Sequence, residues 1–212
     1  MYTRFPFFLA VLMLAGSPLT GEERAPLNFI ATTTNFYAAP EPGSRPIGKL
    51  LVAAPIRAME QTASGWQRIA VPGWTQAGAE RVLQAAPGLR VTRAALAKSG
   101  LEALSFGTSQ DDPDTGQRWQ RTILTGWIAP DAEMAPDLET LWAQAEPLFS
   151  TRCTACHVRR VPEHYTANQW TSYIKVMGPR TGLPKDDQVL IRTFLQYQSA
   201  DSTALLAALS ED

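Results

Sequence analysis

Apolar and polar positions change their spacing along the chain near residue 130. From about Leu27 to Ala129, short apolar or β-branched runs alternate with turn residues, and clear runs cover 29–37, 50–54 and 120–124. Gly, Pro, Ser and Asp cluster between such runs at 40–43, 64–65, 72–73 and 111–116. Short strands separated by turns at this spacing predict a small β-barrel.

From about Pro136 onward, the apolar positions follow the spacing of amphipathic helices. Asp137 can cap the first helix, Thr166 or Asn168 the second, and Pro184 can open a third. Gly178-Pro179 is expected to end the second helix. The predicted buried faces contain Leu138, Leu141, Trp142, Ala145, Trp170, Tyr173, Ile174, Met177, Leu190, Ile191, Phe194 and Leu195. The segment 129–136 is the expected linker between strands and helices.

An internal repeat supports the β character of the first half. The sequence WQRIAVPGW at 66–74 aligns without a gap to WQRTILTGW at 119–127, with five of nine positions identical. Each copy reads as a strand, a tight turn at its Gly and the start of the next strand. One elaborated barrel and two related units both remain open, and a chance echo of a hairpin pattern is the alternative.

The first half also resembles bacterial SH3-like domains. The resemblance rests on Thr34-Asn-Phe-Tyr-Ala-Ala-Pro40, Ile47-Gly-Lys-Leu50, Gly65-Trp-Gln-Arg-Ile69 and Leu124-Thr-Gly-Trp-Ile128. It covers about 100 residues and is interrupted by a long piece from Gln76 to Gly116. It implies a domain over 27–130 that binds partners or acts as a spacer.

The N-terminal residues have the pattern of a secretory signal peptide. Arg4 supplies a positive charge, an apolar stretch runs from Phe5 to Ala15, and small and polar residues follow. Such a stretch is too short to span a bilayer as a helix, and it suits the apolar core of a signal. We expect residues 1–21 to direct the protein to the periplasm, with no membrane span after cleavage; an apolar N-terminus of a cytoplasmic protein is the alternative.

Composition and charge narrow the functional classes. The chain is 45% hydrophobic and 18% charged with a formal net charge of −1, which fits a soluble globular protein and gives no indication of nucleic-acid binding. Residues 22–130 carry 11 Lys and Arg against 9 Asp and Glu, whereas residues 131–212 carry 7 against 11. The acidic second half could favour a basic partner surface, but we prefer the alternative that these charges are ordinary solvated surface.

The motif Cys153-Thr-Ala-Cys-His157 carries the chemistry of the chain. Cys-x-x-Cys-His is the attachment sequence of haem c, in which both thiols form thioethers to one haem and the His binds the iron. Pro147 is expected to start the turn that leads into it. A zinc site completed by His164, a redox disulfide and a structural disulfide are the alternatives, each with poor spacing or context. The motif predicts one covalent haem c with His157 as the proximal ligand.

The second axial ligand has several candidates. Met177 follows His157 by 20 residues and lies at the end of a predicted helix, whereas His164 follows by seven. Reach permits both, but the shorter loop would have to wrap the macrocycle tightly, so we favour Met177 and keep His164 as the alternative. Further upstream lie Met59 and Met134. The expected pocket walls, each of which could equally be core, are Trp170, Tyr173, Phe194 and Leu195, and Arg159 and Arg160 could face the propionates.

The second half resembles a known family. The residues that carry the resemblance are Ala145-Glu-Pro-Leu-Phe149, the cysteine motif, Pro162-Glu-His-Tyr-Thr-Ala-Asn-Gln-Trp170, Met177, Gly182-Leu183 and Phe194-Leu195. They are similar to the C-terminal monohaem domain of the pentahaem cytochromes of trimethylamine N-oxide and S-oxide respiration. The preceding β segment is similar too, at Asp112-Pro-Asp-Thr-Gly116 and Leu124-Thr-Gly-Trp127. The four further haems and the membrane anchor of that family have no counterpart in this sequence.

Together these patterns predict two domains, an all-β SH3-like barrel or pair of barrels over 27–130 and an all-α class I-like cytochrome c domain over 136–212. The resemblance implies an electron carrier, not an enzyme, between a membrane quinol-oxidising multihaem cytochrome and a periplasmic molybdenum reductase. A haem protein with an open sixth site, used for sensing or catalysis with the β domain docking a partner, is the alternative.

Overall fold

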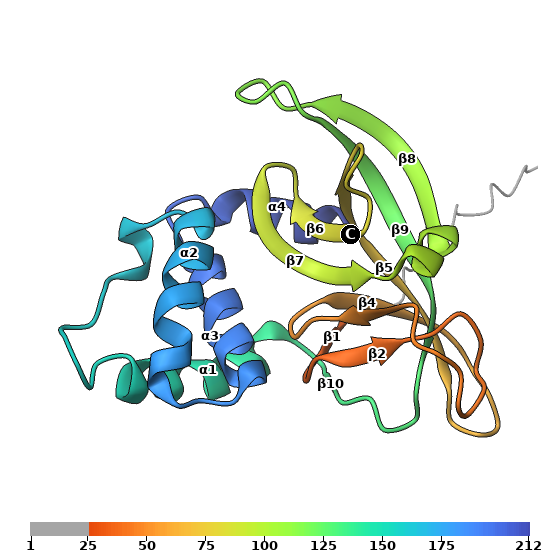
Figure 1. The fold of residues 1–212 in the computed structure, drawn as a ribbon, viewed down its shortest axis with the longest axis horizontal. Helices are drawn as coiled ribbons and strands as arrows, with labels where there is room; N and C mark the ends of the chain where they lie inside the picture. The colour runs from red at the N-terminus through yellow and green to blue at the C-terminus, as the bar shows by residue number, and fades with distance from the viewer. Residues whose placement is uncertain (1–25) are drawn as a thin grey trace, which may run out of the picture.

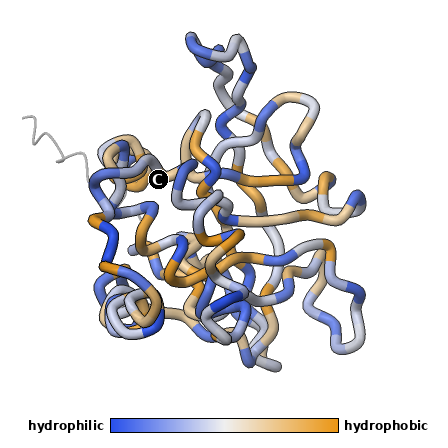
Figure 2. The backbone as a smooth tube through the Cα atoms, turned by 60° about the vertical axis from the view of Figure 1, so that its left-hand side comes forward, coloured by the Kyte–Doolittle hydropathy of each residue, from blue (hydrophilic) through white to orange (hydrophobic). Residues whose placement is uncertain are grey.

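A computed structural model describes residues 26–212 and shows a curled β-sheet with four α-helices packed along one side (Figure 1). The predicted signal peptide, residues 1–21, lies outside the described residues. Within 26–212, no helix combines the length and the apolar character that crossing a membrane requires. The strongly hydrophilic stretches lie mainly at protruding loops (Figure 2).

Ten strands form one sheet. They are β1 (Asn28–Ile30), β2 (Thr34–Phe36), β3 (Gly48–Leu50), β4 (Pro55–Gln61), β5 (Gln67–Gln76), β6 (Val82–Ala86), β7 (Leu89–Leu96), β8 (Leu104–Asp111), β9 (Arg118–Ile128) and β10 (Met134–Ala135). Their order is β10-β1-β4-β5-β6-β7-β3-β2, with β9 paired to β5 and β8 paired to β9. The sheet curls until Tyr37, just after β2, exchanges two backbone hydrogen bonds of 2.9 Å with Trp127 of β9. This curl encloses an apolar core that includes Phe36, Leu50, Ile69 and Leu124.

The two copies of the repeat lie on β5 and β9, which pair with each other in antiparallel register. The second Trp of each copy lies opposite an Arg of the other copy, Trp74 opposite Arg121 and Trp127 opposite Arg68. The prediction of a turn at Pro72-Gly73 is wrong, because both residues lie within the strand β5. Pro72 lies where β5 changes partner from β4 to β6, so no neighbouring strand needs the amide hydrogen that proline lacks.

The first three α-helices begin directly after the residues that the sequence analysis expected at their starts, Asp137, Thr166 and Pro184. The α-helices are α1 (Leu138–Arg152), α2 (Ala167–Met177), α3 (Lys185–Tyr197) and α4 (Ser202–Glu211), with the 3₁₀ turns η1 (Lys98–Ala103), η2 (Pro162–His164) and η3 (Gly178–Thr181). The Asp137 carboxylate accepts a 2.7 Å hydrogen bond from the Thr140 amide at the start of α1. That bond lowers the pKa of Asp137. Pro147, in contrast, does not start a new turn but lies inside α1. The pattern analysis did not predict α4.

Strands and helices share apolar cores, so the predicted fold class, an SH3-like barrel beside a separate all-α domain, is wrong, while the domain bounds 27–130 and 136–212 stay a prediction. Phe29, Val52 and Ala135 of the sheet region are buried in the same cluster as Leu141 of α1 and Trp170 of α2. A second cluster joins Ala85 and Val91 to Leu205 of α4. The expected linker contains β10, whose Ala135 is 3% exposed and pairs with Phe29. The N-terminal part is therefore mostly β, a half-barrel sheet on which the C-terminal helices pack, and not an SH3-like barrel tethered to an all-α domain.

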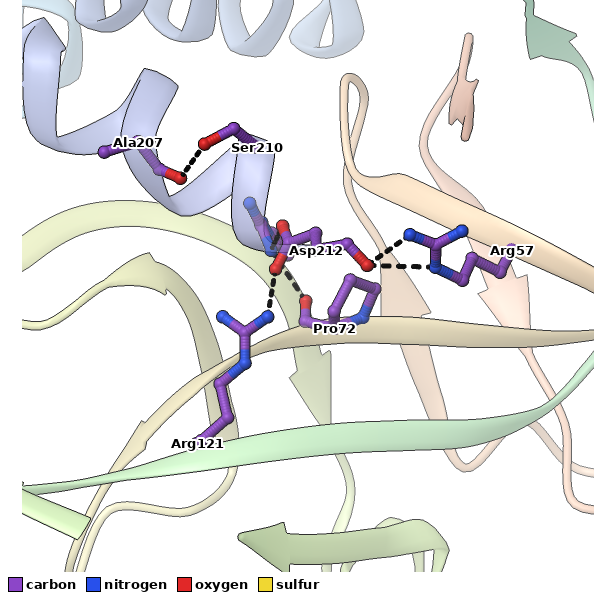
Figure 3. A network of polar contacts seen from close by, with 7 residues as sticks. Arg57, Pro72, Arg121, Ala207, Ser210 and Asp212 are labelled. Atoms are coloured by element: carbon purple, nitrogen blue, oxygen red, sulfur yellow. Dashed lines mark hydrogen bonds and ion pairs between the residues drawn. The ribbon is translucent and has the colours of Figure 1, made fainter. Parts of the chain in front are cut away.

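A polar network at the end of α4 also joins the two parts (Figure 3). The Asp212 carboxylate, which is fully buried, lies 2.6 Å from a guanidinium nitrogen of Arg93 and 2.5 Å from one of Arg121. The guanidinium of Arg57 donates to the Asp212 main-chain oxygen, and that of Arg93 donates to the Pro72 carbonyl at 2.8 Å. Three arginines from the sheet thus hold the last residue of the helical part.

Candidate functional site

A cavity of about 300 Å³ opens between the end of α1, the loop that follows it and the C-terminal half of α2. Its volume is at the lower end of the range for ligand pockets in proteins. Eight of the residues that the sequence analysis named for the haem site line it: Cys153, Cys156, His157, Arg159, Arg160, Trp170, Tyr173 and Met177. The cavity therefore gathers groups from positions up to 24 residues apart in the chain.

The two thiols of the cavity lie where α1 ends. Cys153 is the C-cap of this helix, and its amide donates to the Phe149 carbonyl at 3.2 Å. Both cysteines are free thiols, Cys153 half-buried and Cys156 exposed. Burial raises the pKa of the Cys153 thiol, which keeps it protonated at neutral pH. Two reduced thiols on one cavity wall are what two thioether bonds require.

His157 is held in one tautomer by the loop. Its Nδ1 lies 2.9 Å from the Val158 carbonyl oxygen. A carbonyl oxygen only accepts, so Nδ1 carries the proton, and Nε2 keeps the lone pair that binds a metal. The imidazole is exposed at the cavity and thus retains a free ligand atom.

The stretch from His164 to Trp170, HYTANQW, sets the position of α2. Thr166 and Gln169 form a reciprocal capping box, with hydrogen bonds of 3.2 and 2.8 Å between side chains and backbone amides. The Trp170 indole donates to the Pro162 carbonyl at 3.0 Å. Trp170 is 2% exposed, and its ring packs against those of Tyr165 and Tyr173. This stretch therefore fixes both the start of α2 and the cavity wall.

Asn168 joins α2 to the turn between β6 and β7. Its side-chain oxygen accepts from the Arg90 amide at 2.7 Å, and its side-chain nitrogen donates to the Gly88 carbonyl at 2.8 Å. The side chain of Gln196, on α3, donates to the Arg90 carbonyl at 3.0 Å. The sequence analysis considered Asn168 only as a possible helix cap and did not name Gln196. Because their hydrogen-bond partners lie far away in the sequence, no local pattern predicts these contacts. The only signal that pointed to Asn168 was the distinctive HYTANQW stretch.

The structure separates the candidates for the second axial ligand. Met177 is the last residue of α2, lies in the cavity wall and is 40% exposed. His164 lies in η2, is exposed and is not among the residues that line the cavity. Of the remaining expected wall residues, Phe194 and Leu195 lie in the shared core behind the cavity, and Phe194 packs against Trp142. Neither Phe194 nor Leu195 is among the residues that line the cavity.

Four arginines line the cavity, of which the sequence analysis named two. They are Arg152, Arg159, Arg160 and Arg180. The Arg160 guanidinium donates to the Tyr165 hydroxyl at 2.5 Å and lies over the rings of Tyr165 and Tyr173. That of Arg159 lies 5.2 Å from the centre of the Phe149 ring. The cavity thus combines an aromatic wall with cationic side chains.

These residues fit a haem c group. The apolar wall suits the macrocycle, the two thiols suit covalent attachment, and the imidazole and thioether suit the axial positions of iron. The guanidinium groups suit carboxylate substituents such as propionates. Every donor type that a His/Met-ligated haem c needs from the protein is present in the wall of this single cavity.

Comparison with known proteins agrees with this fit. Residues 25–132 match the family model described as the TorC third cytochrome c domain. The match covers the strands rather than the helices, so the β region itself is similar to a part of these cytochromes. No solved structure shows a significant match to the chain.

Characterised relatives match across both parts. The cytochrome c-type protein TorY of Escherichia coli O157:H7 is 33% identical over 142 residues, which is 66% of this chain and 38% of the relative. The cytochrome c-type protein TorC of Escherichia coli K12 is 28% identical over 156 residues, 73% of this chain and 40% of the relative. The chain thus spans about two fifths of the length of these relatives. From the family match and these relatives, the chain belongs to the TorC/TorY family of c-type cytochromes.

Proposed function

We propose that this protein carries one covalent haem c in the cavity and transfers single electrons. The observation that carries the proposal is the meeting of Cys153, Cys156, His157 and Met177 in one apolar cavity wall. A haem bound there supplies an iron that alternates between the ferrous and ferric states. Membership of a family of cytochromes c supports an electron carrier rather than an enzyme.

Each of the four residues has its own role in this proposal. The Cys153 and Cys156 thiols hold the macrocycle through thioether bonds, and His157 offers Nε2 to the iron. Met177, the last residue of α2, would offer its sulfur as a second ligand. Two protein ligands leave no position for oxygen or substrate, and a Met ligand raises the potential relative to a second His.

The finer role follows from the family resemblance. The protein would receive electrons from a membrane quinol-oxidising multihaem cytochrome and deliver them to a periplasmic molybdenum reductase of N-oxides or S-oxides. This places the protein in the periplasm, in agreement with the signal-like N-terminal sequence. The support is the similarity to TorC and TorY, of which this chain covers only part.

Covalent attachment is the first test. The full chain is expressed with export and haem-maturation machinery, beside Cys153→Ala, Cys156→Ala and the double variant. Intact mass under denaturing conditions should show one haem added to the unmodified chain and none added to the double variant. Because His164 is not among the residues that line the cavity, His164→Ala is the matched control and should keep its haem. An unmodified chain that emerges without covalent haem contradicts the proposal.

A further inference from the structure

Positive charge is concentrated at the mouth of the cavity, although the helical part is acidic overall. Residues 131–212 contain seven Lys and Arg against eleven Asp and Glu. Four of these seven basic residues line the cavity, and no Asp or Glu is among its lining residues. The local charge at the cavity, where electrons would enter and leave, is therefore positive, opposite in sign to the net charge of residues 131–212.

The four arginines are not equally engaged. Arg159 has Glu146 at 3.8 Å, and Arg160 is held over two tyrosine rings. Within residues 26–212, no hydrogen bond or ion pair engages the guanidinium group of Arg152 or that of Arg180, and both residues are exposed. These two cations are therefore available to an outside partner.

The charge would persist with haem in place. A haem c group has two propionate carboxylates, and Glu146 pairs with Arg159, so the four guanidinium groups exceed these three carboxylates by one positive charge. The two free arginines come from different elements, Arg152 from the end of α1 and Arg180 from η3. Both line the cavity.

Exposed apolar side chains accompany this charge. Val158, next to His157, is 88% exposed, and Val161, next to Arg160, is 44% exposed. Exposed apolar groups with arginine around them are the composition of protein–protein interfaces. Complementary charge speeds the encounter of two proteins and sets their orientation.

We propose that the cavity mouth is the docking face for an acidic surface on the redox partner, and that Arg152 and Arg180 attract that surface. This inference rests on the proposed function, because it assumes that electrons leave through the cavity mouth. This partner surface has the opposite charge to the one that the acidic composition of residues 131–212 could suggest. The partner is thus identified by chemistry, as a protein with carboxylates around its own redox centre.

Electron transfer to small complexes of opposite charge tests the local charge. Reduced holoprotein is mixed with hexacyanoferrate(III) or hexaamminecobalt(III), each of which accepts one electron from the ferrous iron. Rates are compared at about 0.01 M and 1 M ionic strength, where the Debye length is about 30 Å and 3 Å. The rate with the anionic complex should fall about tenfold as salt rises, despite the net charge of −1. The cationic complex should show no such fall.

Matched variants separate local from overall charge. The double variant Arg152→Gln/Arg180→Gln should lose most of the salt dependence of the rate with hexacyanoferrate(III). The double variant Arg45→Gln/Lys98→Gln removes the same charge from exposed sites on the sheet part and should keep that salt dependence. Equal slowing in both pairs would show that overall charge decides, which overturns the proposal.

An acidic polypeptide distinguishes docking from the attraction of small anions. Poly-L-glutamate should bind the holoprotein in calorimetry and slow its oxidation by hexacyanoferrate(III), while poly-L-lysine should do neither. A fast reaction with hexacyanoferrate(III) without binding of poly-L-glutamate would overturn the proposal that the cavity mouth is a docking face. The haem spectrum is recorded on every sample, so failure of the haem assignment shows itself separately, as a chain without covalent haem.

Discussion

At the scale of single residues, the cavity depends on side chains that never touch it. Asn168 is the clearest case, because its amide satisfies one donor and one acceptor of the turn between β6 and β7. The same helix carries Trp170, Tyr173 and Met177 to the cavity. A polar side chain of the helix thus uses the sheet as a support for the wall of the site.

Asn168→Ala should lower the free energy of unfolding by about 2 kcal/mol, because it leaves the Arg90 amide and the Gly88 carbonyl without their partner. Urea denaturation followed by circular dichroism measures this loss. Ser172→Ala is the control, since the Ser172 hydroxyl bonds only to the Asn168 carbonyl within α2. Equal stability of the two variants would show that this contact contributes nothing.

The chemistry of the site could be predicted at this scale, because it lies in a short contiguous motif. Cys153, Cys156 and His157 are adjacent in sequence and so necessarily adjacent in space. Arg180 and Asn168 could not be assigned their positions, since their partners are brought to them only by the fold.

At the scale of elements, caps were predictable and strand partners were not. Thr166 and Asp137 satisfy amides within their own first turn, so local sequence is sufficient to place the starts of α1 and α2. Pro72-Gly73 has the composition of a turn, yet it lies within β5. Only the pairing of distant strands explains this, because Pro72 lies in the gap between the partners β4 and β6.

The repeat shows the same limit. Its similarity left one elaborated barrel and two related units both open, and in the structure the two copies form a single antiparallel pair, β5 with β9. Similar strands with similar alternation can pair with each other as readily as they can begin separate barrels. The sequence pattern predicted the strands themselves, and the long-range register decided their arrangement.

At the scale of the whole molecule, strands and helices pack against each other. They share apolar cores, and the Asp212 carboxylate is held between Arg93 and Arg121 of the sheet. Composition changes near residue 130, and this change suggested independent domains. Burial across the boundary is a tertiary property, which no local pattern of residues can report.

Asp212→Asn should destabilise the whole molecule by about 3 kcal/mol, because it leaves the 2% exposed Arg93 as a buried charge without its counter-ion. Thermal unfolding should remain a single transition shifted to lower temperature, with sheet and helices lost together. Asp131→Asn, at an exposed position, is the control. An unchanged midpoint for Asp212→Asn would contradict the structural role of this network.

The absorption spectrum of the oxidised and reduced holoprotein, with Met177→Ala and His164→Ala beside it, tests the central claim most directly. The account predicts sharp low-spin reduced bands and a long-wavelength ferric band that disappears in Met177→Ala and persists in His164→Ala. Reduced Met177→Ala should then bind carbon monoxide, which the unmodified protein should not bind at neutral pH. A high-spin spectrum of the unmodified protein, or loss of the ferric band in His164→Ala alone, would contradict a six-coordinate electron carrier with Met177 on the iron.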